Sequence, residues 1–307
     1  MLLSACLLSY NSAPTLEKAI KSALNQDFTD YELIISDDCS TDRSWELIND
    51  YTKLNNRISA VRTPRNAGVV GNANFAVTQA KGKYVAILHH DDEFRPDLFR
   101  KWVDVMEENP GVGLCFNDYS CKEMNIPSLH AKHLKKSYDK ILNGRYFLKN
   151  HLLNHWGCPV WGSYITRKAI WKELNGFNPL YGILPDVGLT MRIALSWNIG
   201  YINEPLMDLK RVKPEQYPKE YTEFSWKRWI ILFDIHAVNI KRVYGEKNLY
   251  HWFKFRVKVS YEIIKWLMYG VIRKKEKIIK DANEGVNDYE FFFVKIFRSF
   301  LLNIYRI

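Results

Sequence analysis

Apolar runs alternate with helical periodicity over the first part of the chain, and this alternation constrains the fold more than any other feature. The runs cover residues 2–8, 31–36, 58–62 and 84–88. After Pro14, the apolar residues Leu16, Ala19, Ile20 and Ala23 recur at helical spacing. Continuous apolar runs are typical of strands buried on both faces, and strands that alternate with helices form a mostly parallel sheet. The sequence therefore predicts an α/β fold.

Acidic pairs follow two of the predicted strands. Asp37 and Asp38 come after the second strand, and Asp91 and Asp92 come after the fourth. Ligands of such sheets bind at the carboxyl ends of the strands. A carboxylate there can accept hydrogen bonds from a base or a ribose, and hard oxygen ligands suit Mg²⁺ or Mn²⁺ bridging a diphosphate. A solvated turn explains each pair taken alone, but two acidic turns on one sheet favour a nucleotide-diphosphate site.

Seven segments, occurring in order, resemble an inverting family 2 glycosyltransferase. The resemblance extends from Leu2 to about Arg211, and it implies the GT-A fold, a Rossmann-like, mostly parallel sheet flanked by helices. Residues 1–220 would form this domain, with a nucleotide-sugar half over about 1–117 and an acceptor half over about 118–220. The segments are 8–16 (LSYNSAPTL), 24–26 (LNQ), 31–42 (YELIISDDCSTD), 82–92 (GKYVAILHHDD), 161–177, 186–192 (DVGLTMR) and 201–206 (YINEPL).

The resemblance also implies roles for individual residues. Asp186 corresponds to the catalytic base, although from the residues alone an N-cap of a helix over 187–195 is the better interpretation. Asp91 and Asp92 correspond to the ligands of a Mg²⁺ or Mn²⁺ ion. The residues that correspond to donor-binding positions are Leu8, Tyr10, Asp37, Asp38 and Asp91.

Two departures from the family pattern concern the metal and the base. His89 replaces the first Asp of the family's DXD motif, and Pro185 replaces the Glu that precedes the base. These departures support an alternative, a non-catalytic nucleotide-sugar-binding homologue, whereas the retained aspartates favour an enzyme. A nucleotidyltransferase is a further alternative, but it would open with a Gly-rich loop where this chain has Ser9-Tyr10-Asn11. The absence of a Gly-x-Gly-x-x-Gly turn and of a P-loop argues against dinucleotide enzymes and P-loop NTPases.

The expected activity is an inverting transfer of a hexose or N-acetylhexosamine from a UDP-sugar. The acceptor would be a hydroxyl of a glycan, glycolipid or glycoprotein in the assembly of a surface polysaccharide or glycoconjugate. Asp186 would take the proton of that hydroxyl, and a metal at Asp91 and Asp92 would neutralise charge on the departing diphosphate.

The last 87 residues differ from the rest in charge and composition. Residues 1–220 carry 27 basic and 25 acidic residues, whereas residues 221–307 carry 17 basic and 9 acidic residues and 20 of the 44 aromatic ones. Helical spacing of Trp and Phe among Lys and Arg predicts a basic, aromatic-rich helical extension. Such a helix suits an anionic membrane surface. The alternative is a packed subdomain or a homo-oligomer interface, and no nucleic-acid motif accompanies the charge.

Several features predict a cytoplasmic protein. No stretch approaches the roughly 18 apolar residues of a spanning helix, and the N-terminal run lacks a basic region, so it predicts a buried strand and not a secretory signal. The five cysteines show no Cys-x-x-Cys pairing and are typical of reduced thiols. If the C-terminal region binds lipid, the position would be peripheral, on the inner face of the cell membrane.

Overall fold

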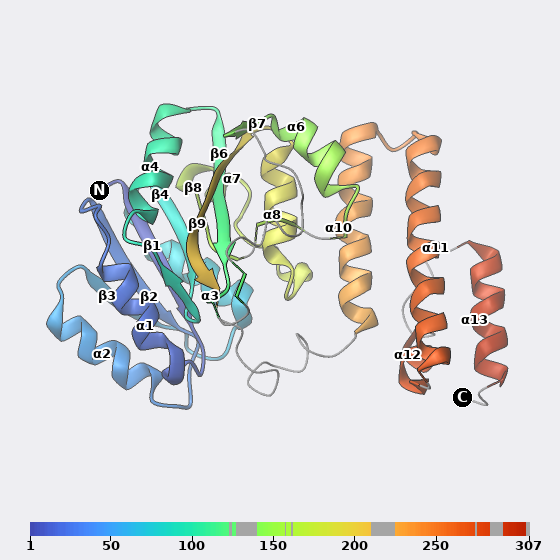
Figure 1. The fold of residues 1–307 in the computed structure, drawn as a ribbon, viewed down its shortest axis with the longest axis horizontal. Coiled ribbons are helices and arrows are strands. Elements are labelled where there is room, and N and C mark those ends of the chain that lie inside the picture. The colour runs from blue at the N-terminus through green and yellow to red at the C-terminus, as the bar shows by residue number, and fades with distance from the viewer. Residues whose placement is uncertain are drawn as a thin grey trace. The chain divides into compact units, whose positions relative to one another are not determined.

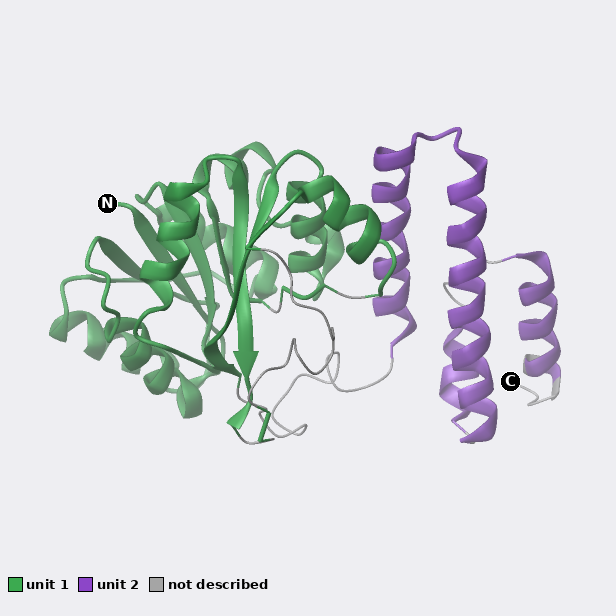
Figure 2. Cartoon of the chain, turned by 45° about the horizontal axis from the view of Figure 1, so that its top comes forward, with its two compact units in different colours: residues 1–212 green, residues 213–307 purple. Residues whose placement is uncertain are grey.

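The computed structural model describes residues 1–122, 125–126, 140–156, 158–160, 162–209, 225–273, 275–282 and 291–304. The chain divides into two compact units, residues 1–212 and 213–307 (Figure 2). The boundary expected from composition, at residue 220, lies outside the described residues, within 210–224.

The first unit is built on one sheet, and the strand order is β3-β2-β1-β4-β8-β6-β9-β5, with β7 paired to β9 (Figure 1). Strands β1, β2, β3 and β4 pair in parallel, and β6 pairs in parallel with β9. Strands β8, β5 and β7 run antiparallel to their partners. The strands are β1 (Leu3–Ser9), β2 (Tyr31–Asp37), β3 (Ile58–Arg62), β4 (Tyr84–His89), β5 (Asp92–Phe94), β6 (Val112–Ser120), β7 (Ile141–Leu142), β8 (Tyr164–Arg167) and β9 (Asn198–Leu209).

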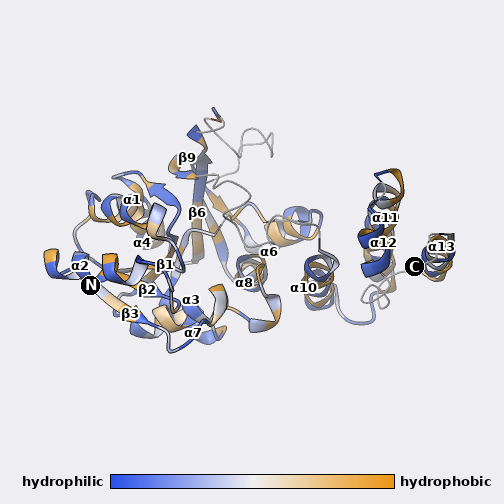
Figure 3. Cartoon of the chain, turned by 90° about the horizontal axis from the view of Figure 1, so that it is seen from below, coloured by the Kyte–Doolittle hydropathy of each residue, from blue (hydrophilic) through white to orange (hydrophobic). Residues whose placement is uncertain are grey.

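Helices cover both faces of this sheet, with α1 and α4 on one face and α3 and α7 on the other (Figure 3). This arrangement confirms the predicted mostly parallel α/β fold. The helices of the unit are α1 (Ala13–Leu24), α2 (Ser44–Leu54), α3 (Gly68–Gln79), α4 (Leu98–Glu108), α6 (Gly144–Phe147), α7 (Lys168–Glu173) and α8 (Pro185–Ala194). A π-helical turn (Leu148–Leu152) follows α6, and a 3₁₀ turn (Pro179–Tyr181) precedes α8.

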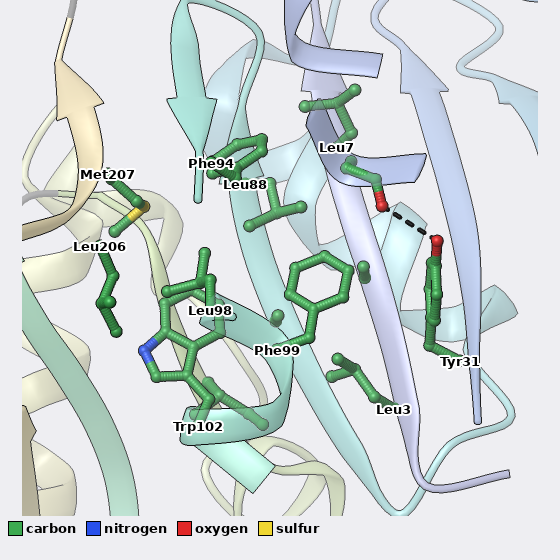
Figure 4. Close-up of a cluster of buried hydrophobic side chains, with 14 of the residues drawn as sticks. Leu3, Leu7, Tyr31, Leu88, Phe94, Leu98, Phe99, Trp102, Leu206 and Met207 are labelled. Atoms are coloured by element: carbon green, nitrogen blue, oxygen red, sulfur yellow. Dashed lines mark hydrogen bonds between the residues drawn. The ribbon is translucent and has the colours of Figure 1, made fainter. Parts of the chain in front are cut away.

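The core of the first unit lies between the sheet and helices α1 and α4 (Figure 4). Tyr31 meets Phe99 edge to face at 5.2 Å between ring centroids, and its hydroxyl donates to the carbonyl of Ala23 at 3.0 Å. Trp102 is fully buried, and its indole N–H donates to Asn117 Oδ1 at 3.1 Å. Both buried polar groups are therefore paired, as burial in an apolar core requires.

The second unit is helical, and its helices are α10 (Trp226–Tyr244), α11 (Leu249–Ile272), α12 (Glu276–Asp281) and α13 (Phe292–Ile304). Gly245, with φ of +86°, ends α10 and allows the turn into α11. The indole N–H of Trp226 donates to the carbonyl of Ile278 at 2.7 Å, so α10 and α12 are joined. Within the described part of the chain, no helix combines the length and the apolar character needed to cross a membrane.

Some predicted element boundaries differ from those of the structure. The helix expected over 187–195 begins two residues earlier, at Pro185. The short strand Asp92–Phe94 was not predicted, because its three residues form a strand only through pairing with β9.

Candidate active site at the carboxyl edge of the sheet

The turns that follow β1 and β2 are tied to each other. Asn11, with φ of +46°, accepts a hydrogen bond from the Thr41 amide at 2.8 Å through its side chain. Its own amide donates to Ser40 Oγ at 2.9 Å. The side chain of Asn72, on α3, donates to the carbonyl of Ser36 at 3.0 Å. These bonds fix the two loops that carry the first predicted site residues.

Asp37 is fully buried, and its carboxylate is held by protein groups. One oxygen accepts from the Ser40 amide at 3.0 Å and pairs with Arg62 Nε at 3.0 Å, and the other accepts from the Ser40 hydroxyl. Arg62 also lies over the ring of Trp45 at 5.2 Å. The contacts of Asp37 are those of a residue that shapes the turn, so any contact with a donor would come in addition to them.

Asp38 is also buried, but only one of its oxygens is used. Oδ1 accepts from the Thr63 hydroxyl and from the Ala67 amide, both at 2.8 Å. Oδ2 receives no hydrogen bond from the residues that the structure describes. A carboxylate with one oxygen fixed and the other open is suited to reading a donor group of a ligand.

The two other donor-site predictions fall on either side of the end of β1. Leu8 is buried within the strand, while Tyr10 follows it and is 42% exposed. An exposed aromatic ring beside the turn that carries Asp38 can stack on a planar base. Leu8 can contribute only packing and backbone groups.

Asp91 lies between β4 and β5, whereas Asp92 is the first residue of β5 and is buried. The pKa of Asp92 is raised well above its usual value, first by burial and then by the charges of Asp91 and Asp208. Ser163 donates to Asp92 Oδ2 at 3.3 Å and opposes this shift. The site thus concentrates negative charge that the nearby protein groups compensate only in part.

A divalent cation fits this chemistry. Among the described residues, no group of three His, Cys, Asp or Glu side chains is placed to hold a metal. Mg²⁺, however, is commonly bound by one or two carboxylates together with phosphate oxygens of the substrate. Asp91 and Asp92 supply hard oxygen ligands of that kind.

Asp186 is the second residue of α8, and the N-cap position belongs to Leu184. The N-cap interpretation of Asp186 is therefore wrong. Its Oδ1 accepts from the adjacent Val187 amide at 2.9 Å. Burial raises the pKa of Asp186, while the Val187 amide, the charge of His89 and the Gly162 amide act in the opposite direction. A carboxyl with a raised pKa is a better proton acceptor than an ordinary aspartate.

Gly162 and Ser163 link the two acidic positions of the site. The Gly162 amide acts on Asp186, and the Ser163 hydroxyl binds Asp92. Gly162 has φ of +78°, and a Cβ there would lie 2.6 Å from His89 Nε2, so the imidazole ring occupies the space that a side chain would need. Tyr119, on β6, donates to the Ser163 carbonyl at 3.3 Å and so helps to fix this dipeptide. Trp161, the residue before it, lies outside the described residues.

Arg192 anchors α8 and so places Asp186. Its guanidinium donates to the carbonyls of Leu174 at 2.7 Å and Gly176 at 2.5 Å. The same turn is tied to α3, because Asn74 exchanges two hydrogen bonds of 2.9 Å with the backbone of Phe177. The helix that carries Asp186 is thus connected to the half of the sheet that carries Asp38.

Arg62 and Asp208 were not predicted as residues of this region. The contact of Ser163 with Asp92 was not predicted either. Asp208 is buried on β9 and accepts from the Ser120 hydroxyl at 2.9 Å and from the Lys122 amide at 3.0 Å. Asp208 stands among the apolar residues of the run Leu206–Leu209, and an acid in such a run is a sequence signal for a functional residue. The pairing of Arg62 with Asp37 depends on parallel register between β2 and β3, which the sequence does not display.

Comparison with known proteins identifies the family. The model of glycosyl transferase family 2 matches residues 4–173, more than half of the chain. The chain belongs to glycosyl transferase family 2. The match confirms the resemblance stated from the motifs, and it covers every predicted site residue except Asp186.

Individual relatives in this family share part of their length with the chain. It is 35% identical over 119 residues to the glycosyltransferase TuaG of Bacillus subtilis, named for teichuronic acid biosynthesis. It is 30% identical over 141 residues to WfaP of Escherichia coli, named a UDP-Glc:α-D-GlcNAc-diphosphoundecaprenol β-1,3-glucosyltransferase. These matches cover 39% and 46% of this chain, and the chain spans about half the length of each relative, 47% and 55%.

The solved structure of Staphylococcus aureus TarS, residues 1–349, in complex with UDP-GlcNAc superposes with a TM-score of 0.69. The match covers 92% of this chain and 80% of the TarS 1–349 chain at 16% identity. At that identity the likeness shows the fold alone, and the fold is that of the GT-A glycosyltransferases.

Proposed function

We propose that this family 2 protein transfers a sugar from a UDP-sugar to a hydroxyl group of a glycan, glycolipid or glycoprotein, with inversion at the anomeric carbon. Asp186 acts as the general base. Asp38 and Tyr10 hold the base of the nucleotide, together with Leu8 and the turn of Asp37. Asp91 and Asp92 face the diphosphate.

The observation that carries this proposal is the joining of two acidic positions far apart in the sequence. Asp92 begins β5 and Asp186 is the second residue of α8, yet the Ser163 hydroxyl donates to Asp92 and the Gly162 amide lowers the pKa of Asp186. A transferase needs a proton acceptor on one side of the anomeric carbon and a place for the anionic leaving group on the other. The Gly162–Ser163 dipeptide joins residues suited to these two tasks.

The reaction is a single displacement. The acceptor oxygen forms a bond to the anomeric carbon as the bond from that carbon to the diphosphate oxygen breaks. The hydroxyl proton passes to the Asp186 carboxylate, and the nucleoside diphosphate leaves with the electron pair of the broken bond. One base opposite the leaving group gives inversion.

A Mg²⁺ or Mn²⁺ ion held by Asp91 and Asp92 would supply charge neutralisation for the departing diphosphate. The Ser163 hydroxyl keeps one oxygen of Asp92 oriented. Asp208 adds negative charge beside it and thereby strengthens the preference for a cation.

Relatives support the donor and the acceptor class. The name of WfaP specifies a UDP-sugar and a lipid-linked acceptor, and TarS was solved with UDP-GlcNAc. We extend these classes to this chain as a hexosyl or N-acetylhexosaminyl transfer from UDP. The product would enter a cell-envelope polysaccharide or glycoconjugate.

The location we propose is cytoplasmic and peripheral, on the inner face of the cell membrane. The basic, aromatic-rich C-terminal region supports it, since anionic lipids attract such segments. Assembly into a homo-oligomer through residues 221–307 is the competing explanation of that region.

The test is release of UDP or GDP from a panel of nucleotide sugars, with and without an acceptor extract. We expect release from one or a few UDP-sugars, greater with acceptor and lost in EDTA. Release from GDP-sugars alone would contradict the donor, and unchanged release in EDTA would contradict the metal. No release from any donor, with intact UDP binding, would favour a non-catalytic homologue.

A further inference from the structure

Helix α11 exposes an apolar face along much of its length. Tyr250, Phe253, Val257, Tyr261 and Met268 recur at intervals of three, four or seven residues and are between 40% and 65% exposed. This spacing places them on one side of a helix of 24 residues, about 36 Å long. The opposite side is buried through Phe255, Val259, Ile263 and Leu267. The helix is therefore apolar on its packed side and on its exposed side.

Helix α13 continues this apolar surface. Phe292, Phe293, Ile296 and Phe300 are between 54% and 76% exposed, whereas Val294 is fully buried on the opposite side. The two helices lie side by side within the second unit (Figure 1). Their exposed faces meet at Phe291, whose ring lies 5.4 Å from that of Phe253 and 5.7 Å from that of Phe293. We call these exposed residues of α11 and α13, with Phe291, the α11–α13 face.

The charge on these helices is mostly positive. Together α11 and α13 carry six Lys or Arg residues, of which Arg298 is buried, and one acidic residue. That acid, Glu262, is buried and paired with Lys265 at 2.9 Å. Hydrophobic and hydrophilic residues are interspersed along both helices (Figure 3).

Cationic groups lie directly over aromatic rings of the face. Lys254 Nζ is 5.5 Å from the centroid of Tyr250, and the Arg256 guanidinium is 4.6 Å from that of Phe291. Long basic side chains that lie along aromatic surface can keep their charge in a polar layer while the rings enter an apolar one. Aromatic rings with cations beside them are the composition of helices that lie in a membrane interface.

We propose that the α11–α13 face docks on an anionic lipid bilayer. Monomeric soluble proteins seldom expose a continuous apolar surface of this kind, so the face requires a partner. A protein partner could bury the apolar residues equally well. The Lys and Arg side chains beside the aromatic rings, however, favour a surface that carries negative charge around an apolar layer. This inference specifies the residues behind the peripheral location proposed above and does not depend on the transfer reaction.

The test is co-sedimentation of the full chain with vesicles of phosphatidylcholine alone or with phosphatidylglycerol. We expect binding to the phosphatidylglycerol vesicles and a loss of binding as salt is raised. The variant Lys254→Glu should weaken the partition coefficient about tenfold or more, since each basic residue near such a surface contributes about 1 kcal/mol. The double variant Phe253→Ser/Phe293→Ser should weaken it by at least a comparable factor.

Matched controls change the same kinds of residue elsewhere. Lys227→Glu on α10 produces the same change of net charge as Lys254→Glu. Tyr146→Ser on α6 removes an aromatic ring of similar exposure, 61% against 58% and 59% for the two phenylalanines. Both controls should bind vesicles within about twofold of the wild type, and the melting temperature of every variant is measured to show that it remains folded.

Three results would overturn the proposal. The first is failure of the wild type to bind phosphatidylglycerol vesicles at low salt. The second is equal loss of binding in the controls and in the face variants. The third is a dimer, measured by light scattering, that the phenylalanine variants dissociate and that ignores vesicles, since the face would then be a homo-oligomer interface.

Discussion

At the scale of single residues, a substitution of Asp186 can distinguish a catalytic role of this carboxylate from a structural one. The residue is not an N-cap, and burial raises its pKa, so the folded protein favours its neutral form. We predict that Asp186→Asn lowers kcat by 10²- to 10⁴-fold, the usual contribution of a general base, while UDP-sugar affinity stays near that of the wild type. Steady-state kinetics and donor titration measure the two effects. Transfer close to the wild-type rate would remove Asp186 from the mechanism.

The sign of the pH dependence follows from the same raised pKa. In the wild type, kcat/KM should fall as the pH drops through the folded pKa of Asp186, which lies above the ordinary value for aspartate. The stability that the neutral carboxyl provides is present at low pH and is lost as the pH rises through that range. Asp186→Asn should therefore melt at a higher temperature than the wild type at neutral pH, and the difference should shrink on acidification. A variant less stable than the wild type at every pH would contradict this account.

Asp38 offers a third prediction on this scale. One of its oxygens is fixed by Thr63 and Ala67, and the other receives no hydrogen bond from the described residues. We predict that Asp38→Ala raises KM for the donor more than it lowers kcat, because a contact with the base acts in the ground state and the transition state alike. Thr63→Val serves as the control for loss of the turn's own hydrogen bond. Equal donor affinity in Asp38→Ala and the wild type would limit Asp38 to shaping the turn.

At the scale of elements, the sequence predicted those strands whose positions are marked by a local run of apolar residues. The runs of the first four strands predicted their positions to within a residue or two. For β1, β2 and β4 the reason is burial on both faces, which needs a continuous apolar run, whereas β3 is largely half-buried or exposed. The run Leu206–Leu209 contains Asp208, and the strand Asp92–Phe94 has only three residues, so neither displays that pattern. The pairing of β5 with β9 places Glu93 opposite Asp208 and brings Asp208 near Asp92.

The same limit applies to the candidate site. The order of the family motifs predicted site roles for Asp38, Asp92 and Asp186. The residues that hold these side chains in place are distant in the sequence. Ser163 reaches Asp92 across 71 positions of sequence, and Arg62 reaches Asp37 only through strand register. The type of a residue can indicate its chemical role from the sequence. Which residues it contacts depends on the three-dimensional fold.

The Gly162–Ser163 dipeptide yields a prediction at this scale. The three atoms nearest to a Cβ at position 162 would all belong to the ring of His89, at 2.6 to 3.1 Å. We predict that Gly162→Ala lowers kcat severalfold by displacing His89 or the amide that faces Asp186. The double variant His89→Ala/Gly162→Ala should recover to the rate of His89→Ala alone, apart from backbone strain of about 1 kcal/mol.

Gly245 provides a matched control for that strain. Its φ is +86°, and a Cβ there would have no atom within 4 Å, so Gly245→Ala introduces the strain without a collision. Gly245→Ala should lose stability with little change in kcat. If the double variant is as slow as Gly162→Ala, the collision with His89 is not the cause of the loss.

At the scale of the whole molecule, the chain divides into two compact units, for which we propose separate tasks. The first unit carries every residue of the candidate site, and the second carries the α11–α13 face. If that face holds the protein on a bilayer, an acceptor in the same bilayer is met at a much higher effective concentration than one in solution. The contribution of the second unit should then depend on where the acceptor is.

The Phe253→Ser/Phe293→Ser variant tests this division of labour. With an acceptor embedded in anionic vesicles, we predict that the variant lowers the transfer rate at limiting acceptor by about tenfold or more, in step with its loss of vesicle binding. With a water-soluble acceptor of the same sugar sequence, it should match the wild type in kcat and in both KM values. Equal losses with both acceptors would place the phenylalanines in the fold or the site. An undiminished rate on vesicles, despite lost binding, would show that docking does not deliver the acceptor.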